Sequence, residues 1–136
     1  MLFTQKSEVD IHEMSPLALA FVGDAVLELL VRARLVGTTR LQPNRLHTVA
    51  THYVSAHAQN LELDIIEPML TDAEAAVLRR GKNASKATVA KHATVQEYRA
   101  STGFECLLGW LYLNGQLERV HQLFEVLWQQ FDPDQK

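Results

Sequence analysis

Two acidic residues stand in otherwise apolar stretches of the sequence. Asp24 lies within LALAFVGDAVLELLVRARLV, and Glu105 lies within STGFECLLGWLYL. An ionised carboxylate in such surroundings is costly unless it is paired, hydrogen-bonded or bound to a cation. If the two acids meet inside a helical bundle or at its rim, their oxygens would suit Mg²⁺ or Mn²⁺. From spacing alone, the favoured alternative is that each acid pairs with a nearby arginine, such as Arg32 or Arg99.

A third carboxylate follows the first by one helical turn. Glu28 comes four residues after Asp24 and shares its helix face. Glu28 could be a further metal ligand, or a hydrogen-bond acceptor for a group that itself binds the metal. The favoured interpretation is that it pairs with Arg32, the next residue on that face.

Other familiar catalytic or zinc-binding patterns are missing from the sequence. His47, His52 and His57 recur every five residues, so they cannot converge on one ion as an i, i+4 pair does. They are expected at the surface or at helix caps. The single Cys106 excludes an internal disulfide and a cysteine-based zinc site, fits a reducing cytosol, and is expected to be buried. There is no P-loop, dinucleotide fingerprint or Ser-His-Asp arrangement.

The composition is that of a globular protein with a mild excess of acid. The 136 residues include 13 Lys and Arg against 16 Asp and Glu, for a net charge of −3, and 47% are apolar. No apolar run approaches the roughly 20 residues that span a membrane, and the polar N-terminus does not read as a secretory signal. The net charge alone argues against a nucleic-acid-binding protein.

The distribution of charge changes that interpretation. The window from Ala75 to Gln96 carries +5 and no acid, so the rest of the chain carries −8. Its sequence, RRGKNASKATVAKHATV, is rich in small polar residues, and part of it is expected to form an exposed loop. A basic loop on an acidic body suits a polyanion, most often a phosphate backbone, although an ordinary solvated loop is the alternative.

The hydrophobic pattern and the helix signals predict an all-α fold in a single domain. Ser15-Pro16 is a helix start, the T-x-x-E pattern at Thr71 is a capping box, and Asn114-Gly115 is a C-cap. Pro68 is expected to break a short segment near 64–67. The expected helices run from Ser15-Pro16 to Gly37, from Pro43-Asn44 to about Leu61, from Thr71 to Gly81, from Val95 to Leu113 and from Leu117 to Phe131.

Three stretches resemble the ribonuclease III family. Residues 19–28, LAFVGDAVLE, are similar to its signature helix, whose usual form is close to LEFLGDAVLE. Residues 102–113, TGFECLLGWLYL, resemble its second acidic motif, close to DTFEALLGAIYLD, and YVSAHAQ at 53–59 resembles the helix between them. Order and spacing match, and the resemblance covers roughly residues 13–130 of a single domain expected over 1–136.

Two departures from the family pattern narrow the resemblance. Ala20 and Thr102 stand where the family usually has acids, while Asp24 and Glu105 remain. This reduced set resembles Mini-ribonuclease III, a bacterial subfamily that has the catalytic domain without a double-stranded-RNA-binding domain. RGKNASK at 80–86, Tyr98-Arg99, and Asn44 with Leu46-His47 also look like that subfamily.

The resemblance implies a cytoplasmic homodimer that cuts both strands of double-stranded RNA. Its expected substrate is a precursor of ribosomal RNA, the 23S precursor, with ribosomal proteins as further partners. The products would carry a 5′ phosphate and a 3′ hydroxyl. Asp24 and Glu105 would be the catalytic residues and would hold Mg²⁺, or Mn²⁺ in its place, with waters and RNA oxygens completing the coordination. Ala20 and Thr102 are not expected to be ligands, and water is expected to fill the space they leave.

The same resemblance gives the basic window a role, because the catalytic domain would have to supply its own contacts to the RNA backbone. The missing acids leave open a non-catalytic RNA-binding or scaffolding domain. A helical module that binds an acidic protein is the third alternative. The expected RNA-contacting residues are Arg79, Arg80, Lys82, Asn83, Lys86 and Lys91.

Overall fold

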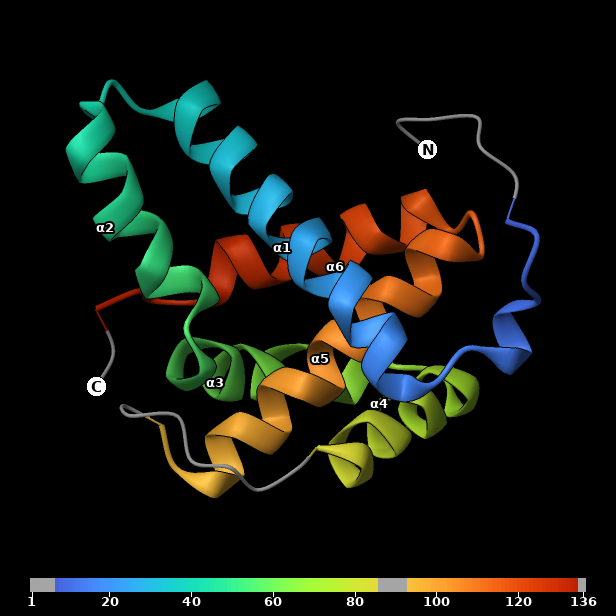
Figure 1. Ribbon diagram of the computed structural model, residues 1–136. Helices are drawn as coiled ribbons and strands as arrows, with labels where there is room; N and C mark the ends of the chain where they lie inside the picture. Colours follow the sequence, from blue (N-terminus) through green and yellow to red (C-terminus); the bar gives the residue numbers. More distant parts are fainter. Residues whose placement is uncertain (1–6, 86–92, 135–136) are drawn as a thin grey trace.

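The computed structural model describes residues 7–85 and 93–134, and the all-α prediction is confirmed (Figure 1). Over these residues, no helix is both long enough and apolar enough to cross a membrane. The elements in chain order are η1 (Ile11–Glu13), α1 (Pro16–Thr38), α2 (Pro43–Val54), α3 (Ala56–Ile66), η2 (Glu67–Met69), α4 (Asp72–Ala84), α5 (Val95–Leu113) and α6 (Leu117–Gln130).

Side-chain caps fix the starts of α1 and α4 as the sequence predicts. The Ser15 hydroxyl accepts a hydrogen bond from the Ala18 N–H, and Pro16 occupies the first turn of α1. Thr71 opens α4 with a reciprocal capping box, in which Glu74 returns a bond to the Thr71 N–H. These bonds satisfy N–H groups that have no partner within the helix.

Two of the expected helix boundaries are wrong. The helix expected to continue to about Leu61 is divided at Ser55, which ends α2 and caps α3 by accepting from the Ala58 N–H. The extended backbone of Ser55, with ψ of 158°, interrupts the helical hydrogen bonding there. Gly81 does not end α4, which continues to Ala84.

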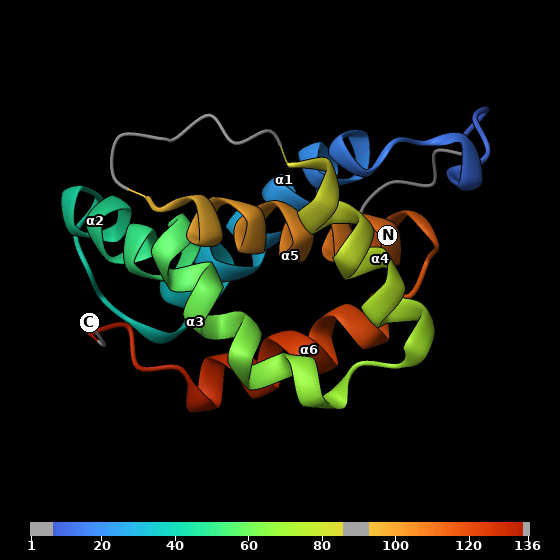
Figure 2. The same cartoon turned by 90° about the horizontal axis from the view of Figure 1, so that it is seen from below.

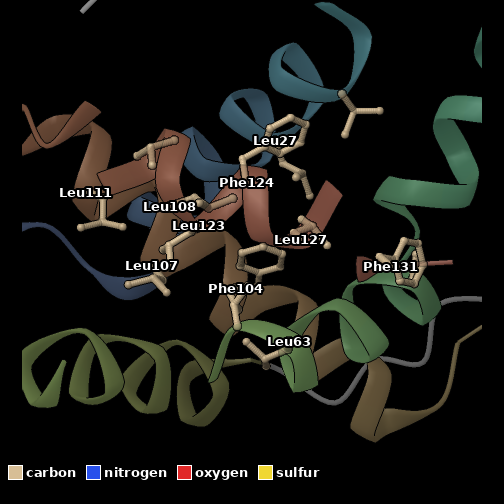
Figure 3. Close-up of a cluster of buried hydrophobic side chains, with 14 of the residues drawn as sticks. Leu27, Leu63, Phe104, Leu107, Leu108, Leu111, Leu123, Phe124, Leu127 and Phe131 are labelled. Carbon is tan, nitrogen blue, oxygen red and sulfur yellow. The ribbon is translucent and has the colours of Figure 1, made fainter. Parts of the chain in front are cut away.

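Helix α5 is the element on which the others assemble. It packs against α1, α3, α4 and α6, and in Figure 2 it runs between α3 and α4. Its buried residues Phe104, Leu107 and Leu111 meet Leu27 from α1 and Leu123 from α6, which Figure 3 draws as part of one cluster. Burying each such side chain contributes about 1.5–3 kcal/mol, so most of the folding free energy is expected to come from this helix and its neighbours.

Two glycines bring the backbones of α1 and α5 into direct contact. A Cβ added at Gly23 would lie 1.6 Å from the Glu105 carbonyl oxygen, and one added at Gly109 would lie 1.9 Å from that of Leu19. No side chain fits at either position. Because Asp24 follows Gly23, this contact carries Asp24 of α1 to the turn of α5 that holds Glu105.

Gly81 has the corresponding role between α4 and α5. An added Cβ would lie 2.7 Å from the Cβ of Cys106 and 2.8 Å from the Cα of Gly103. Gly81 therefore does not stop the helix, as its position in the sequence suggested, but allows α4 to pack closely against α5. The basic turn of α4 is thereby held against the same part of α5.

We expect Gly23→Ala and Gly109→Ala each to destabilise the fold by about 3 kcal/mol or more, because two helix backbones would have to separate. Gly37→Ala is the matched control, since an added Cβ meets nothing within 4 Å in the last turn of α1. That variant should gain about 0.5–1 kcal/mol from better helix propensity. Urea unfolding of the three variants measures this, and equal effects at Gly23 and Gly37 would contradict the contact.

One carboxyl group is buried without a partner. Glu62 on α3 has 0% of its surface exposed, and neither carboxyl oxygen has a hydrogen-bond partner among the described residues. Burial raises the pKa of Glu62 from 4.5 to about 9, because the charged form is the costly one away from water. The native protein therefore keeps this group neutral at neutral pH.

This burial predicts that stability falls as the pH rises from about 5 to 9. Over that range Glu62 ionises in the unfolded chain but stays protonated in the native one, so the unfolded state binds fewer protons. The slope contributed by one group is at most about 1.4 kcal/mol per pH unit. Glu62→Gln should flatten the pH dependence of urea unfolding by up to that amount, and an unchanged slope would show that Glu62 ionises normally in the fold.

Candidate metal centre

Glu105 occupies the turn of α5 that touches α1, and its carboxylate is half-buried. Gln59 of α3 donates a hydrogen bond from Nε2 to Glu105 Oε2 at 3.1 Å. The same nitrogen donates to the Val54 carbonyl oxygen at 2.9 Å. Two helices therefore contact Glu105: α1 lies against its backbone carbonyl, and Gln59 of α3 holds one carboxylate oxygen.

The surroundings of Glu105 disfavour ionisation of its carboxyl group. Burial raises the pKa of Glu105 to about 8, the Gln59 hydrogen bond opposes that shift, and the carboxylates of Asp24 and Glu28 raise it further. Asp24 is therefore close enough to interact with Glu105, as the family resemblance implies, whereas the sequence spacing alone favoured an arginine partner for each acid. Asp24 itself is exposed, which corrects the expectation that both acids are enclosed by apolar side chains.

The arginines that could have neutralised the acids are engaged elsewhere. Arg32 donates from Nε to Glu28 Oε2 at 3.0 Å, which confirms the pairing expected for Glu28. Arg99 donates to the Lys82 carbonyl oxygen and to Asn83 Oδ1, both at 3.1 Å. Among the described residues, neither Asp24 nor Glu105 has an arginine partner, and the side-chain donor to Glu105 is the neutral amide of Gln59.

A divalent cation fits this donor set. The nearby Asp24 carboxylate raises the pKa of Glu105, and a pair of carboxylates with no arginine partner is stabilised when a cation binds between them. Across residues 7–85 and 93–134, no three or more His, Cys, Asp or Glu side chains are grouped so as to hold an ion. Asp24 and Glu105 would thus supply two ligands, and waters or substrate oxygens would supply the rest.

The two positions that lack an acid are not ligands in this arrangement. Ala20 is buried against α5 and Cys106. Thr102 donates from Oγ1 to the Tyr98 carbonyl oxygen at 3.0 Å and lies 3.3 Å from Ser85 Oγ of α4. Its hydroxyl is therefore committed to its own helix and to α4.

Four of the residues expected to contact RNA lie on α4, the helix that packs against α5 through Gly81. Arg79, Arg80 and Asn83 are exposed on α4, and Lys82 is half-buried with Nζ 3.5 Å from Glu67 Oε1. The part of the basic window from Arg79 to Asn83 is therefore helical. The other two expected contacts, Lys86 and Lys91, lie outside the described residues.

Arg80 of α4 lies close to the turn of α5 that carries Glu105. Its charge lowers the pKa of the Cys106 thiol, although burial dominates and raises that pKa to about 11. Cys106 directly follows Glu105, so Arg80 lies near the turn that bears the candidate ligand. Cys106 is buried as expected.

The histidines behave as the sequence predicts. His47 and His52 are exposed on α2, and the exposed His57 lies with Nδ1 2.5 Å from Glu97 Oε2 on α5. None of them forms a zinc site among the described residues.

Gln59 is the residue that sequence reasoning missed. It has 1% of its surface exposed and contacts Glu105 directly. Its only sequence signal is a polar amide within the YVSAHAQ stretch, and the contact joins residues 46 positions apart. Helix periodicity cannot reveal such a contact.

The Ribonuclease III domain family model matches residues 17–116, the segment from the start of α1 to the end of α5. This chain belongs to the ribonuclease III family. Mini-ribonuclease 3 of Enterococcus faecalis is 46% identical over 116 residues, covering 84% of this chain and 88% of that protein. Mini-ribonuclease 3 of Brevibacillus brevis is 42% identical over 123 residues, covering 89% and 92%.

A crystal structure supports the ribonuclease III-like fold. A protein of Fusobacterium nucleatum superposes with a TM-score of 0.80 at 28% identity, covering 92% of this chain and 98% of that one. With the Mini-ribonuclease 3 relatives, these findings make the protein an endoribonuclease of the ribonuclease III family. The non-catalytic scaffold and the acidic-protein module are correspondingly not favoured.

Proposed function

We propose that this ribonuclease III domain cleaves double-stranded RNA with Mg²⁺ held by Asp24 and Glu105, and with Mn²⁺ as a substitute. The observation that carries the proposal is the meeting of these two carboxylates without a paired arginine, where the helix backbones touch at Gly23. The ribonuclease III family is generally dependent on Mg²⁺, which agrees with the donor set.

The two carboxylates would bind the metal ion, which would activate the water that attacks the RNA. Mg²⁺, when bound, supplies a Lewis acid and lowers the pKa of a coordinated water. Asp24, which is exposed, and Glu105, which is half-buried, would hold that cation. Attack of water on phosphorus with departure of the 3′ oxygen leaves a 5′ phosphate and a 3′ hydroxyl.

The RNA backbone is contacted by the basic residues beside the carboxylates. A-form RNA is recognised through its shape, phosphates and 2′ hydroxyls, and lysine and arginine supply the charge that these contacts need. Gly81 holds α4 against α5, and the charge of Arg80 acts on the Cys106 thiol next to Glu105, which supports Arg80 as a contact close to the proposed cleavage site. The proposed contacts are Arg79, Arg80, Lys82, Asn83, Lys86 and Lys91.

A homodimer explains the exposed apolar face of α1. Leu17, Phe21, Leu29 and Val36 are exposed, and at 100° per residue they fall within an arc of about 120°. Phe21 has 83% of its surface exposed, which is unfavourable for a large aromatic side chain in water. A second copy of this chain would cover that face, and Asp24 at its edge would let each protomer cut one strand.

The proposed substrate is a precursor of ribosomal RNA, the 23S precursor, processed in the cytoplasm with ribosomal proteins as neighbours on the RNA. The support is the Mini-ribonuclease III resemblance together with the buried, unpaired Cys106, which suits a reducing compartment.

Replacing either carboxylate should abolish efficient cleavage. Asp24→Asn and Glu105→Gln are each expected to lower the rate on duplex RNA with Mg²⁺ by about 100-fold or more, because each removes a charged ligand. Glu118→Gln, at an exposed position on α6, is the matched control and should cleave like the wild type. Undiminished cleavage by both site variants would overturn the assignment.

Arg80→Ala should weaken binding of duplex RNA and reduce its dependence on salt. Loss of one phosphate contact is expected to lower the slope of log K against log salt by about one. Arg40→Ala is the control, since Arg40 lies beyond the end of α1, about 20 Å along the axis from Asp24. Fluorescence anisotropy at several salt concentrations measures both slopes, and equal slopes for the two variants would contradict the proposed contact.

Sedimentation equilibrium tests the dimer. The wild type is expected at twice the 15.4 kDa chain mass at micromolar concentration, and Phe21→Asp should sediment as a monomer because it places a charge in the apolar interface. A wild type that remains monomeric would contradict the proposal.

A further inference from the structure

The amide of Gln59 makes two hydrogen bonds from a single nitrogen. Nε2 donates to the Val54 carbonyl oxygen at 2.9 Å and to Glu105 Oε2 at 3.1 Å, and these bonds use both of its hydrogens. Turning the amide over would place Oε1 against two acceptors and lose both bonds. The orientation of Gln59 is therefore fixed.

The Val54 carbonyl is a rigid point of attachment. Val54 is the last residue of α2, and carbonyl groups in the last turn of a helix have no N–H partner further along it. Ser55 both ends α2 and caps α3, so the chain on either side of Gln59 is held by hydrogen bonds. Gln59 links this junction to the carboxylate of Glu105.

Burial strengthens the link. Gln59 has 1% of its surface exposed, so water does not compete for its N–H groups. Its Oε1 has no partner among the described residues, which means that the side chain is held here despite an unsatisfied acceptor. A side chain selected only for burial would be apolar at this position.

We propose that Gln59 is a positioning residue for cleavage, which holds the Glu105 carboxylate in the orientation that binds the divalent cation. Gln59 touches neither the cation nor the RNA in this role. It acts through Glu105 by fixing one oxygen, so that the carboxylate does not rotate toward solvent or away from Asp24. The inference rests on the proposed role of Glu105 as a metal ligand.

The same helix provides a matched control. Glu62 follows Gln59 by three residues, is equally buried, and makes no hydrogen bond among the described residues. Gln59→Met and Glu62→Met both replace a buried polar side chain with a flexible apolar one of similar size. Only Gln59→Met removes a contact with Glu105. Glu62→Met therefore reports the effect of altered packing alone, and any additional loss in Gln59→Met reports the positioning of Glu105.

The experiment compares both variants with the wild type in cleavage of duplex RNA, and in metal-free crystal structures. Gln59→Met is expected to lower kcat by about 10-fold or more, since small misplacements of a reacting group have effects of this size, with KM for RNA within about twofold. Its crystal structure should show the Glu105 carboxylate rotated or in two conformations. Glu62→Met should leave kcat, KM and the Glu105 orientation unchanged.

Either of two results would overturn the proposal: an unmoved Glu105 with wild-type kcat in Gln59→Met, or equal losses of kcat in both variants. If Gln59→Met fails to fold, Gln59→Asn replaces it, because its amide is one methylene too short to reach both acceptors and should give the same loss. If the wild type itself cleaves no duplex RNA, the proposed function fails, whereas the crystal structures still report whether Gln59 orients Glu105.

Discussion

The contact between the backbones of α1 and α5 determines the arrangement of the functional residues. Gly23 and Gly109 leave no room for even a methyl group between the helices. This contact sets the register at which Asp24 meets Glu105. The buried leucines of α5 supply much of the folding free energy, but their packing would allow α1 to shift slightly along α5. The contacts of the two glycines with carbonyl oxygens do not allow such a shift.

Beside that contact, the negative charges of the candidate site are not balanced by a positive side chain among the described residues. Glu105 is held half-buried near Asp24 and Glu28, with an amide as its hydrogen-bond donor and with Arg32 committed to Glu28. Across residues 7–85 and 93–134 no positive side chain pairs with Asp24 or Glu105; keeping two carboxylates together in this way opposes folding, and a cation that binds them offsets that cost. Because Ala20 and Thr102 replace acids of the family pattern, the repulsion is smaller than four carboxylates would create. The metal is then expected to bind weakly until RNA supplies further oxygens.

Most of the fold and the acidic pair followed from local signals in the sequence. Ser15-Pro16, the capping box at Thr71 and the Asn114-Gly115 stop act within one turn of helix, so their positions could be predicted. The motifs around Asp24 and Glu105 pointed to the candidate site through the family resemblance. The break at Ser55 was missed because serine is common inside helices as well as at caps. Gly81 was misread because its reason is the partner helix α5.

The remaining features depend on contacts between distant parts of the chain. The link from Gln59 to Glu105 and the exposure of Asp24 both follow from how α1, α3 and α5 pack. The exposure of Leu17, Phe21, Leu29 and Val36 on α1 could not be predicted from the sequence either, because an apolar helix pattern does not say which of its faces the other helices cover.

The central claim is that packing of α1 on α5 creates a cation site from Asp24 and Glu105. A crystal structure of the wild-type protein soaked in Mn²⁺, with anomalous scattering to locate the metal, tests it most directly. The account predicts an anomalous peak coordinated by carboxylate oxygens of both residues. A peak bound elsewhere with these two acids free, or an arginine paired with either acid where the metal should be, would contradict it.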